Sequence, residues 1–162
     1  VQNQSGLDID ALIKHKKEGS PVQTFPGGQA MDSDALVGVK CDIWIPAARP
    51  DVLTENNVDQ LKAKLVIHGA NIPATETAEQ LMHERGILNI PDFIANAGGV
   101  ICAAVEFGGG SESQVMDTIE EKIRTNTLET LERSKKENLS PREAGVKMAL
   151  SRIKKAMTDN DT

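Results

Sequence analysis

The sequence is poor in aromatic residues, and it has no tyrosine. Aromatic residues make up only 2% of the 162 positions, whereas 39% of the positions are hydrophobic. The core of a compact fold must therefore be aliphatic, built from Ile, Leu, Val, Ala and Met. A chain of this length is expected to form a single domain, spanning residues 1–162.

Other absences restrict the class of protein. No run of about 18 apolar residues is present that could cross a membrane, and no signal peptide is visible. The net charge of -6 disfavours binding to nucleic acid or to an anionic membrane surface. The count of two cysteines, Cys41 and Cys102, permits a disulfide, but both lie in apolar segments, which favours buried free thiols in a reducing compartment, here the cytoplasm. The three histidines lack the spacing of a metal site, so no metal is expected.

The glycine fingerprint of dinucleotide-binding folds, G-x-G-x-x-G, is also missing. Gly27-Gly28, Gly98-Gly99 and the glycines at 108–110 match neither its spacing nor its strand-to-helix context. Either the fold is of another kind, or its first βαβ unit lies upstream of Val1. The opening Val1-Gln2-Asn3 resembles a strand end entering a turn, so we expect a fragment or a processed chain.

Short aliphatic runs alternate with helical patterns over residues 1–107. The runs at 41–45, 65–67 and 87–90 are continuous rather than alternating, which is typical of parallel strands covered on both faces. Asp8, Thr54 and Thr75 each precede an apolar stripe and are predicted to begin helices. This is the rhythm of βαβ units.

The pattern changes after the glycines at 108–110. An amphipathic helix is predicted over 112–138, and Ser140-Pro141-Arg142-Glu143 forms a capping box that starts another helix. Residues 111–157 are therefore predicted to form a helical hairpin. The expected fold class is α/β, a partial Rossmann-like parallel sheet of about three strands followed by this hairpin.

The three predicted strands end in small residues: Pro46-Ala47-Ala48, Gly69-Ala70-Asn71 and the segment 95–99. In open parallel sheets, ligands bind outside the carboxyl ends of the strands. Asparagine offers both a donor and an acceptor, which suits a carboxamide or a ribose. We interpret the loop that carries Asn96 as one wall of a ligand crevice. Ordinary strand-to-helix turns also favour Gly and Asn, and composition alone does not name the ligand.

Four segments, in order, resemble the glutamate/leucine/phenylalanine/valine dehydrogenases, with glutamate dehydrogenase the nearest in appearance. They are Gly6-Leu7-Asp8-Ile9, the CDIWIPAA of residues 41–48, Gly69-Ala70-Asn71, and the PDFIANAGGV of residues 91–100. The helical hairpin also suits the family's C-terminus, so the resemblance covers nearly the whole chain.

The resemblance implies the C-terminal part of the nicotinamide-binding domain of an amino acid dehydrogenase. Such an enzyme deaminates an L-amino acid, here L-glutamate first, to a 2-oxo acid and ammonia, with NAD or NADP accepting the hydride. Ala47 and Ala48 would line the nicotinamide side, and Asn71 and Asn96 would bond the ribose and carboxamide region. The family's catalytic lysine and aspartate lie in the other domain, so no catalytic residue is expected here and the chain alone should be inactive.

Two positions depart from the family pattern. Asn3 stands where an acidic residue often binds the adenine ribose, and its lack of charge favours tolerance of NADP. Ala103 stands at a substrate-binding position where glutamate enzymes usually carry a serine. This second departure leaves a leucine- or valine-type substrate open.

Other interpretations also stay open. The chain would then be a non-catalytic binding or assembly module, or a small α/β domain with an unrelated ligand. Half of a doubly wound sheet would leave an apolar edge, so a homo-oligomer is expected. His68, just before Gly69, is expected to be hydrogen-bonded or partly exposed.

Overall fold

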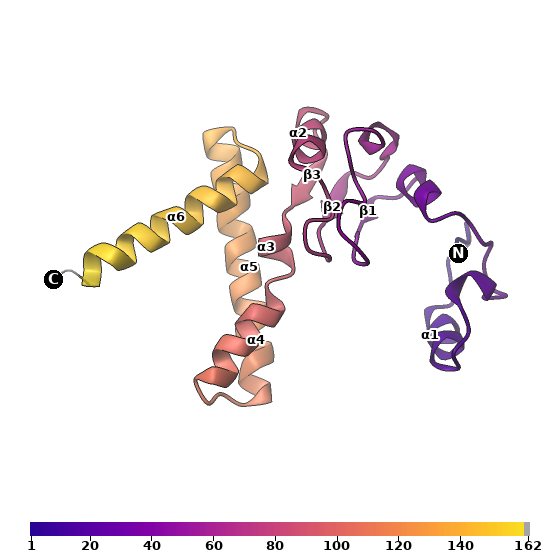
Figure 1. Ribbon diagram of the computed structural model, residues 1–162, viewed down its shortest axis with the longest axis horizontal. Helices are drawn as coiled ribbons and strands as arrows, with labels where there is room; N and C mark the ends of the chain where they lie inside the picture. Colours follow the sequence, from indigo (N-terminus) through magenta and orange to yellow (C-terminus); the bar gives the residue numbers. More distant parts are fainter. Residues whose placement is uncertain (161–162) are drawn as a thin grey trace. The chain divides into compact units, whose positions relative to one another are not determined.

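The computed structural model describes residues 1–160, which form two compact units (Figure 1). The first unit spans Val1–Val39, and the second begins at Lys40. The expectation of one domain over residues 1–162 stays a prediction. Within the described part of the chain, no helix has both the length and the apolar character needed to cross a membrane.

The first unit holds one α-helix and two short 3-10 helices. Its elements are α1 (Ile9–Lys17), η1 (Val22–Thr24) and η2 (Asp34–Gly38). Asp8 begins α1 as predicted, because its carboxylate accepts a hydrogen bond from the N–H of Ala11.

The second unit is a parallel sheet followed by helices. Its elements, in chain order, are β1 (Ile43–Trp44), η3 (Val58–Gln60), β2 (Leu65–Ile67), α2 (Glu76–Glu84), β3 (Leu88–Ile90), α3 (Asp92–Ala95), α4 (Gly98–Phe107), α5 (Glu112–Glu137) and α6 (Pro141–Asn160). The strands are parallel and lie in the order β1-β2-β3, with Ile43, Leu65 and Leu88 in register. The three predicted strands and the α/β class are therefore confirmed.

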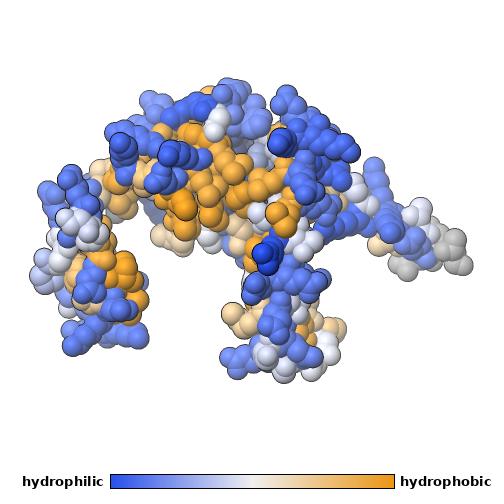
Figure 2. Space-filling view, turned by 180° about the vertical axis from the view of Figure 1, so that it is seen from behind, coloured by the Kyte–Doolittle hydropathy of each residue, from blue (hydrophilic) through white to orange (hydrophobic). Residues whose placement is uncertain are grey.

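The sheet is not covered on both faces, contrary to the expectation. Val66 in the central strand is fully buried, and Ile90 packs with Ile94 and Met148. Ile43 and Leu88, however, are 53% and 41% exposed. Figure 2 shows the resulting apolar area over the sheet.

The C-terminal helical hairpin is confirmed. Helix α5 ends at Asn138, whose left-handed φ of 52° turns the chain. Ser140 and Glu143 then form the predicted capping box, since each donates its N–H to the other's side chain, at 2.9 and 3.3 Å. Thr130 of α5 contacts Met148 of α6 inside the packed pair.

Three local expectations were wrong. The helix predicted after Thr54 is only the 3-10 turn η3, and Thr54 does not cap it. The segment with Asn96 is not an open loop, because α3 and α4 flank this residue. Cys41 and Cys102 are free thiols, as predicted, but both are half-buried rather than buried.

Candidate functional site

The carboxyl ends of β1 and β2 lie close together because Gly69 has no side chain. The N–H groups of Gly69 and Ala70 both donate to the carbonyl of Pro46, at 3.1 and 2.8 Å. A Cβ atom at Gly69 would lie only 2.9 Å from the Cβ of Ala47. This close approach brings Ala47 and Ala48, both exposed, beside the end of β2.

The ends of β2 and β3 are joined by two asparagine side chains. The Nδ2 of Asn96 donates to the Oδ1 of Asn71 at 2.7 Å, across 25 residues of sequence. Asn71 is exposed and Asn96 is half-buried. The Asn71 amide keeps its two N–H donors, and the Asn96 oxygen keeps its acceptor capacity. The pair can therefore bind a ligand that presents acceptors and donors side by side.

Helix α4 begins at Gly98, two residues after Asn96, and its first turn is open. Its N-cap, Ala97, has only a methyl side chain, which cannot accept a hydrogen bond from the first N–H groups of the helix. A Cβ atom at Gly99 would meet nothing within 4 Å, so packing in this chain does not require a glycine there. The first turn of α4 leaves room for a ligand group to approach its backbone.

Ile72, next to Asn71, has a strained backbone. Its φ of 48° lies in the left-handed region, which a β-branched residue rarely adopts. Such a conformation costs about 1–2 kcal/mol. Two hydrogen bonds hold it, from the Ile72 N–H to Asp92 Oδ2 at 2.9 Å and from the Asp51 N–H to the Ile72 carbonyl at 3.0 Å. Strain held by specific bonds is typical of functional sites.

A cluster of charged side chains lies next to the carboxyl ends of the strands, and Asp92 connects it to Ile72. The guanidinium of Arg142, on α6, donates to both carboxylate oxygens of Glu79 at 2.7 and 2.6 Å and to Asp92 Oδ1 at 2.9 Å. Burial raises the pKa of Glu79, and the bonds to Arg142 oppose that change only in part. Burial also acts to raise the pKa of Asp92, but the Ile72 N–H and Arg142 outweigh it, so this pKa is lowered.

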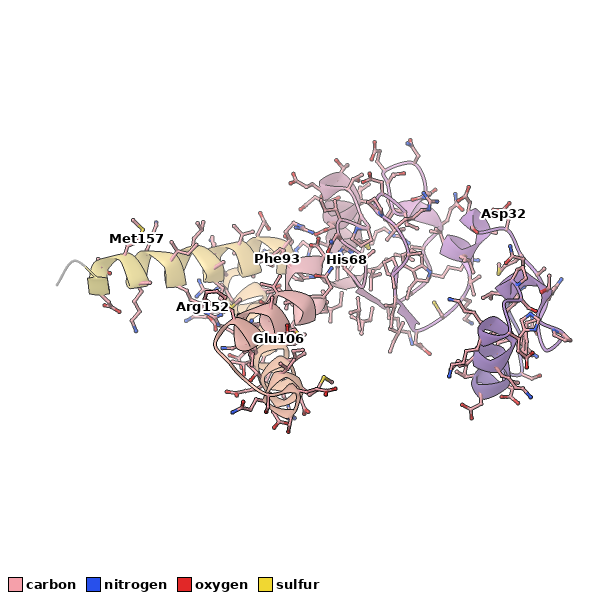
Figure 3. The ribbon with its side chains drawn as sticks, turned by 60° about the horizontal axis from the view of Figure 1, so that its bottom comes forward. Asp32, His68, Phe93, Glu106, Arg152 and Met157 are labelled. Atoms are coloured by element: carbon pink, nitrogen blue, oxygen red, sulfur yellow. The ribbon has the colours of Figure 1, made fainter. Side chains whose placement is uncertain are left out.

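His68 lies within the same region and is fully buried (Figure 3). Neither of its ring nitrogens has a hydrogen-bond partner in the described part of the chain, so the expectation of a hydrogen-bonded or partly exposed imidazole was wrong. Burial lowers the pKa of His68 from 6.5 to about 4. The imidazole is therefore neutral at pH 7, and its 3.8 Å approach to Glu79 is not an ion pair there.

A groove of about 760 Å³ lies between α2 and α6, and Glu79 and Arg142 form part of its wall. Asn71 and Asn96 do not line it. The groove and the carboxyl ends of the strands are therefore separate features, and Arg142, which lines the groove, also bonds Asp92.

Four of the predicted site residues follow the carboxyl ends of the strands: Ala47 and Ala48 after β1, Asn71 after β2, and Asn96 after β3. Ala103 lies on the exposed side of α4. Asn3 lies in the first unit, where its amide bonds the Gly27 carbonyl and the Ser5 N–H, each at 2.9 Å.

Sequence reasoning missed the cluster of Glu79, Asp92 and Arg142. In the sequence, Arg142 stands only within a capping box, and its partners lie 63 and 50 residues away. The single local hint is the Pro91-Asp92 step after β3, which puts a carboxylate where small residues prevail.

Comparison with known proteins identifies the family. A profile described as Glutamate/Leucine/Phenylalanine/Valine dehydrogenase matches residues 1–160. The chain belongs to this family of amino acid dehydrogenases. A glutamate dehydrogenase of Thermotoga maritima is 33% identical over 159 residues. That match covers 94% of this chain and 38% of the relative, so the chain spans about two fifths of the relative's length.

Solved structures of the dehydrogenases share the fold. The hetero-hexameric glutamate dehydrogenase of Thermus thermophilus, in its Leu-bound form, matches with a TM-score of 0.79 at 21% identity. The match covers 96% of this chain and 38% of the Thermus chain. The L-tryptophan dehydrogenase of Nostoc punctiforme matches with a TM-score of 0.75 at 24% identity. That match covers 90% of this chain and 43% of the Nostoc chain. These likenesses concern the architecture alone.

Proposed function

We propose that this chain is the nicotinamide-dinucleotide-binding portion of an amino acid dehydrogenase. The observation that carries the proposal is the Asn71–Asn96 pair, which presents donors and acceptors at the carboxyl ends of two neighbouring parallel strands. The pair binds the ribose and carboxamide region of NAD or NADP. Ala47 and Ala48, beside it, leave a flat surface for the nicotinamide ring.

The proposed reaction is the oxidative deamination of L-glutamate to 2-oxoglutarate and ammonia. The similarity to the Thermotoga maritima glutamate dehydrogenase supports this substrate. Ala103 favours the alternative, a leucine- or valine-type substrate, because its methyl group offers no hydrogen bond to a side-chain carboxylate.

The chain alone is proposed to be inactive. It spans 38% of its relative, and the resemblance implies that the family's catalytic lysine and aspartate lie in the other domain. Exposed apolar residues on β1, such as Ile43 at 53%, support the proposal of a homo-oligomer. The cytoplasm is the proposed compartment, and the uncharged Asn3 favours tolerance of the 2'-phosphate of NADP.

A fluorescence titration of the purified chain with NADH and with NADPH tests the proposal. We expect saturable binding of both nucleotides and no formation of NAD(P)H from L-glutamate, L-leucine or L-valine. Lack of binding to either nucleotide would favour the non-catalytic assembly module instead. Turnover by the chain itself would refute the proposed inactivity, and light scattering at high concentration would refute the oligomer if only monomer were seen.

A further inference from the structure

The asparagine pair is connected to helix α6 through Asp92. One carboxylate oxygen of Asp92 accepts the N–H of Ile72, the residue after Asn71, at 2.9 Å. The backbone carbonyl of Asp92 accepts the N–H of Asn96 at 2.8 Å. Asp92 therefore holds the backbone on both sides of the pair. Its other carboxylate oxygen accepts from Arg142 of α6 at 2.9 Å.

The guanidinium of Arg142 is itself fixed from several sides. Two of its nitrogens bond the two oxygens of Glu79, which is only 4% exposed. The guanidinium also lies over the ring of Phe93, at 5.3 Å from the ring centroid. A Cβ atom on Gly145, one turn further along α6, would lie 2.9 Å from that ring. Figure 3 places Phe93 beside the first turns of α6.

This arrangement differs from a simple anchor for the helix. Glu79 alone would satisfy a bidentate guanidinium and would tie α6 to α2. The additional bond to Asp92 is directed at the carboxylate that keeps Ile72 in its left-handed conformation. Arg142 thus orients the Asp92 carboxylate, which accepts the N–H of the strained Ile72. Because Asn71 directly precedes Ile72, this orientation also affects the position of the Asn71 side chain.

We propose that Arg142 is a positioning residue for the nucleotide site. It holds Asp92 in place, and Asp92 holds the backbone at Ile72 so that Asn71 meets Asn96. This inference rests on the proposed function, because the ligand is the nicotinamide dinucleotide proposed above. It makes the start of α6 part of the binding machinery, although α6 contributes no atom to the asparagine pair.

Hydrogen exchange and nucleotide titration of Arg142→Met test the inference in the 162-residue chain. The first measurement follows the Ile72 amide by NMR without any nucleotide, well below the unfolding temperature. We expect exchange at Ile72 to be at least about tenfold faster than in the wild type, because its acceptor loses orientation. We also expect the Kd for NADH to rise roughly tenfold. Arg142→Lys should recover only part of either change, since an ammonium cannot replace the planar fork.

Two further variants separate positioning from stability. Arg152→Met removes an arginine of the same helix that bonds Glu129 and Asn126 at 2.6 and 2.8 Å, and it should alter neither measurement. Asp92→Asn keeps the Arg142–Glu79 pair and the size of the side chain, so α6 stays anchored. Asp92→Asn should still accelerate exchange at Ile72. If Arg142→Met fails to fold, this variant tests the link between Asp92 and the Ile72 N–H.

The outcomes are distinct. A lower Tm in Arg142→Met, with Ile72 exchange and the Kd unchanged, would reduce Arg142 to a structural anchor and overturn the inference. A wild-type chain that binds no nucleotide would refute the proposed function and, with it, any role of Arg142 in nucleotide binding. Faster exchange at Ile72 in both Arg142→Met and Asp92→Asn, together with weaker binding, supports the inference.

Discussion

Asn96 donates a 2.7 Å hydrogen bond to Asn71 across the ends of two parallel strands. If these amides bind the nucleotide, Asn71→Ala and Asn96→Ala should each weaken binding of NADH roughly threefold to tenfold, because each loses one or two neutral hydrogen bonds. Isothermal titration measures the Kd. Asn126→Ala on α5 is the matched control and should bind as the wild type does. Equal affinity in all four proteins would place the nucleotide elsewhere.

Two glycines at the site should respond in opposite ways to alanine. Gly69→Ala puts a Cβ atom 2.9 Å from Ala47, so we expect a loss of about 1–3 kcal/mol in the free energy of unfolding. Gly99→Ala meets no atom within 4 Å and lies in helix α4, so it should stabilise the fold by up to about 1 kcal/mol. Urea denaturation measures both effects.

Gly99→Ala should also weaken nucleotide binding, since the methyl group would occupy space that the ligand needs. Titration of this variant separates binding from stability, because its fold is expected to be at least as stable as the wild type. A Gly99→Ala protein that binds NADH normally would mean that the open first turn of α4 does not face the ligand.

The buried imidazole of His68 should make the protein sensitive to acid. Its pKa is lowered from 6.5 to about 4, so between these values the unfolded chain takes up a proton that the folded chain does not. A tenfold change in proton affinity corresponds to about 1.4 kcal/mol, so the free energy of unfolding should fall by up to about 3 kcal/mol as the pH drops through this window. The full stability is present above pH 6.5, and this contribution is lost progressively as the pH falls to about 4.

Urea denaturation of the wild type and of His68→Leu from pH 7.5 to pH 4 checks this. The difference in unfolding free energy between the two proteins should grow in favour of the variant as the pH falls. The carboxylates of Glu79 and Asp92 contribute to both curves, so the comparison isolates the imidazole. Parallel curves would show that the folded chain protonates His68 as readily as the unfolded chain does.

The capping box of α6 should contribute measurably to stability. Ser140 is buried, and its hydroxyl accepts the N–H of Glu143 at 3.3 Å, so Ser140→Ala should cost about 1 kcal/mol. Ser151→Ala is the control on the same helix, because that exposed hydroxyl bonds only the Lys147 carbonyl and should change stability little. Thermal unfolding followed by circular dichroism gives both values, and equal losses would argue against the cap.

Much of the secondary structure was predictable because its signals are local. The side chains of Asp8, Thr75 and Ser140 each accept a hydrogen bond from the N–H three residues ahead. These capping residues therefore predict where α1, α2 and α6 begin. The sequence does not predict helices α3 and α4, because Asn96 and the glycine pair are typical of a loop, and packing of α4 on α5 overrides those preferences. The opposite difference occurs between β1 and β2, where a helix is predicted after Thr54 and only the 3-10 turn η3 forms.

The sequence by itself determined the aliphatic core, the three parallel strands and the small residues at their ends, since each depends on neighbours along the chain. It placed Asn71 and Asn96 at strand ends, but their meeting depends on the parallel register of β2 and β3. Only the tertiary structure decided that Arg142 meets Glu79 and Asp92, because that contact requires α6 to dock against α2 and α3. Side chains 50 or 63 residues apart leave no periodic trace in a sequence, so their pairing depends on the packed fold alone.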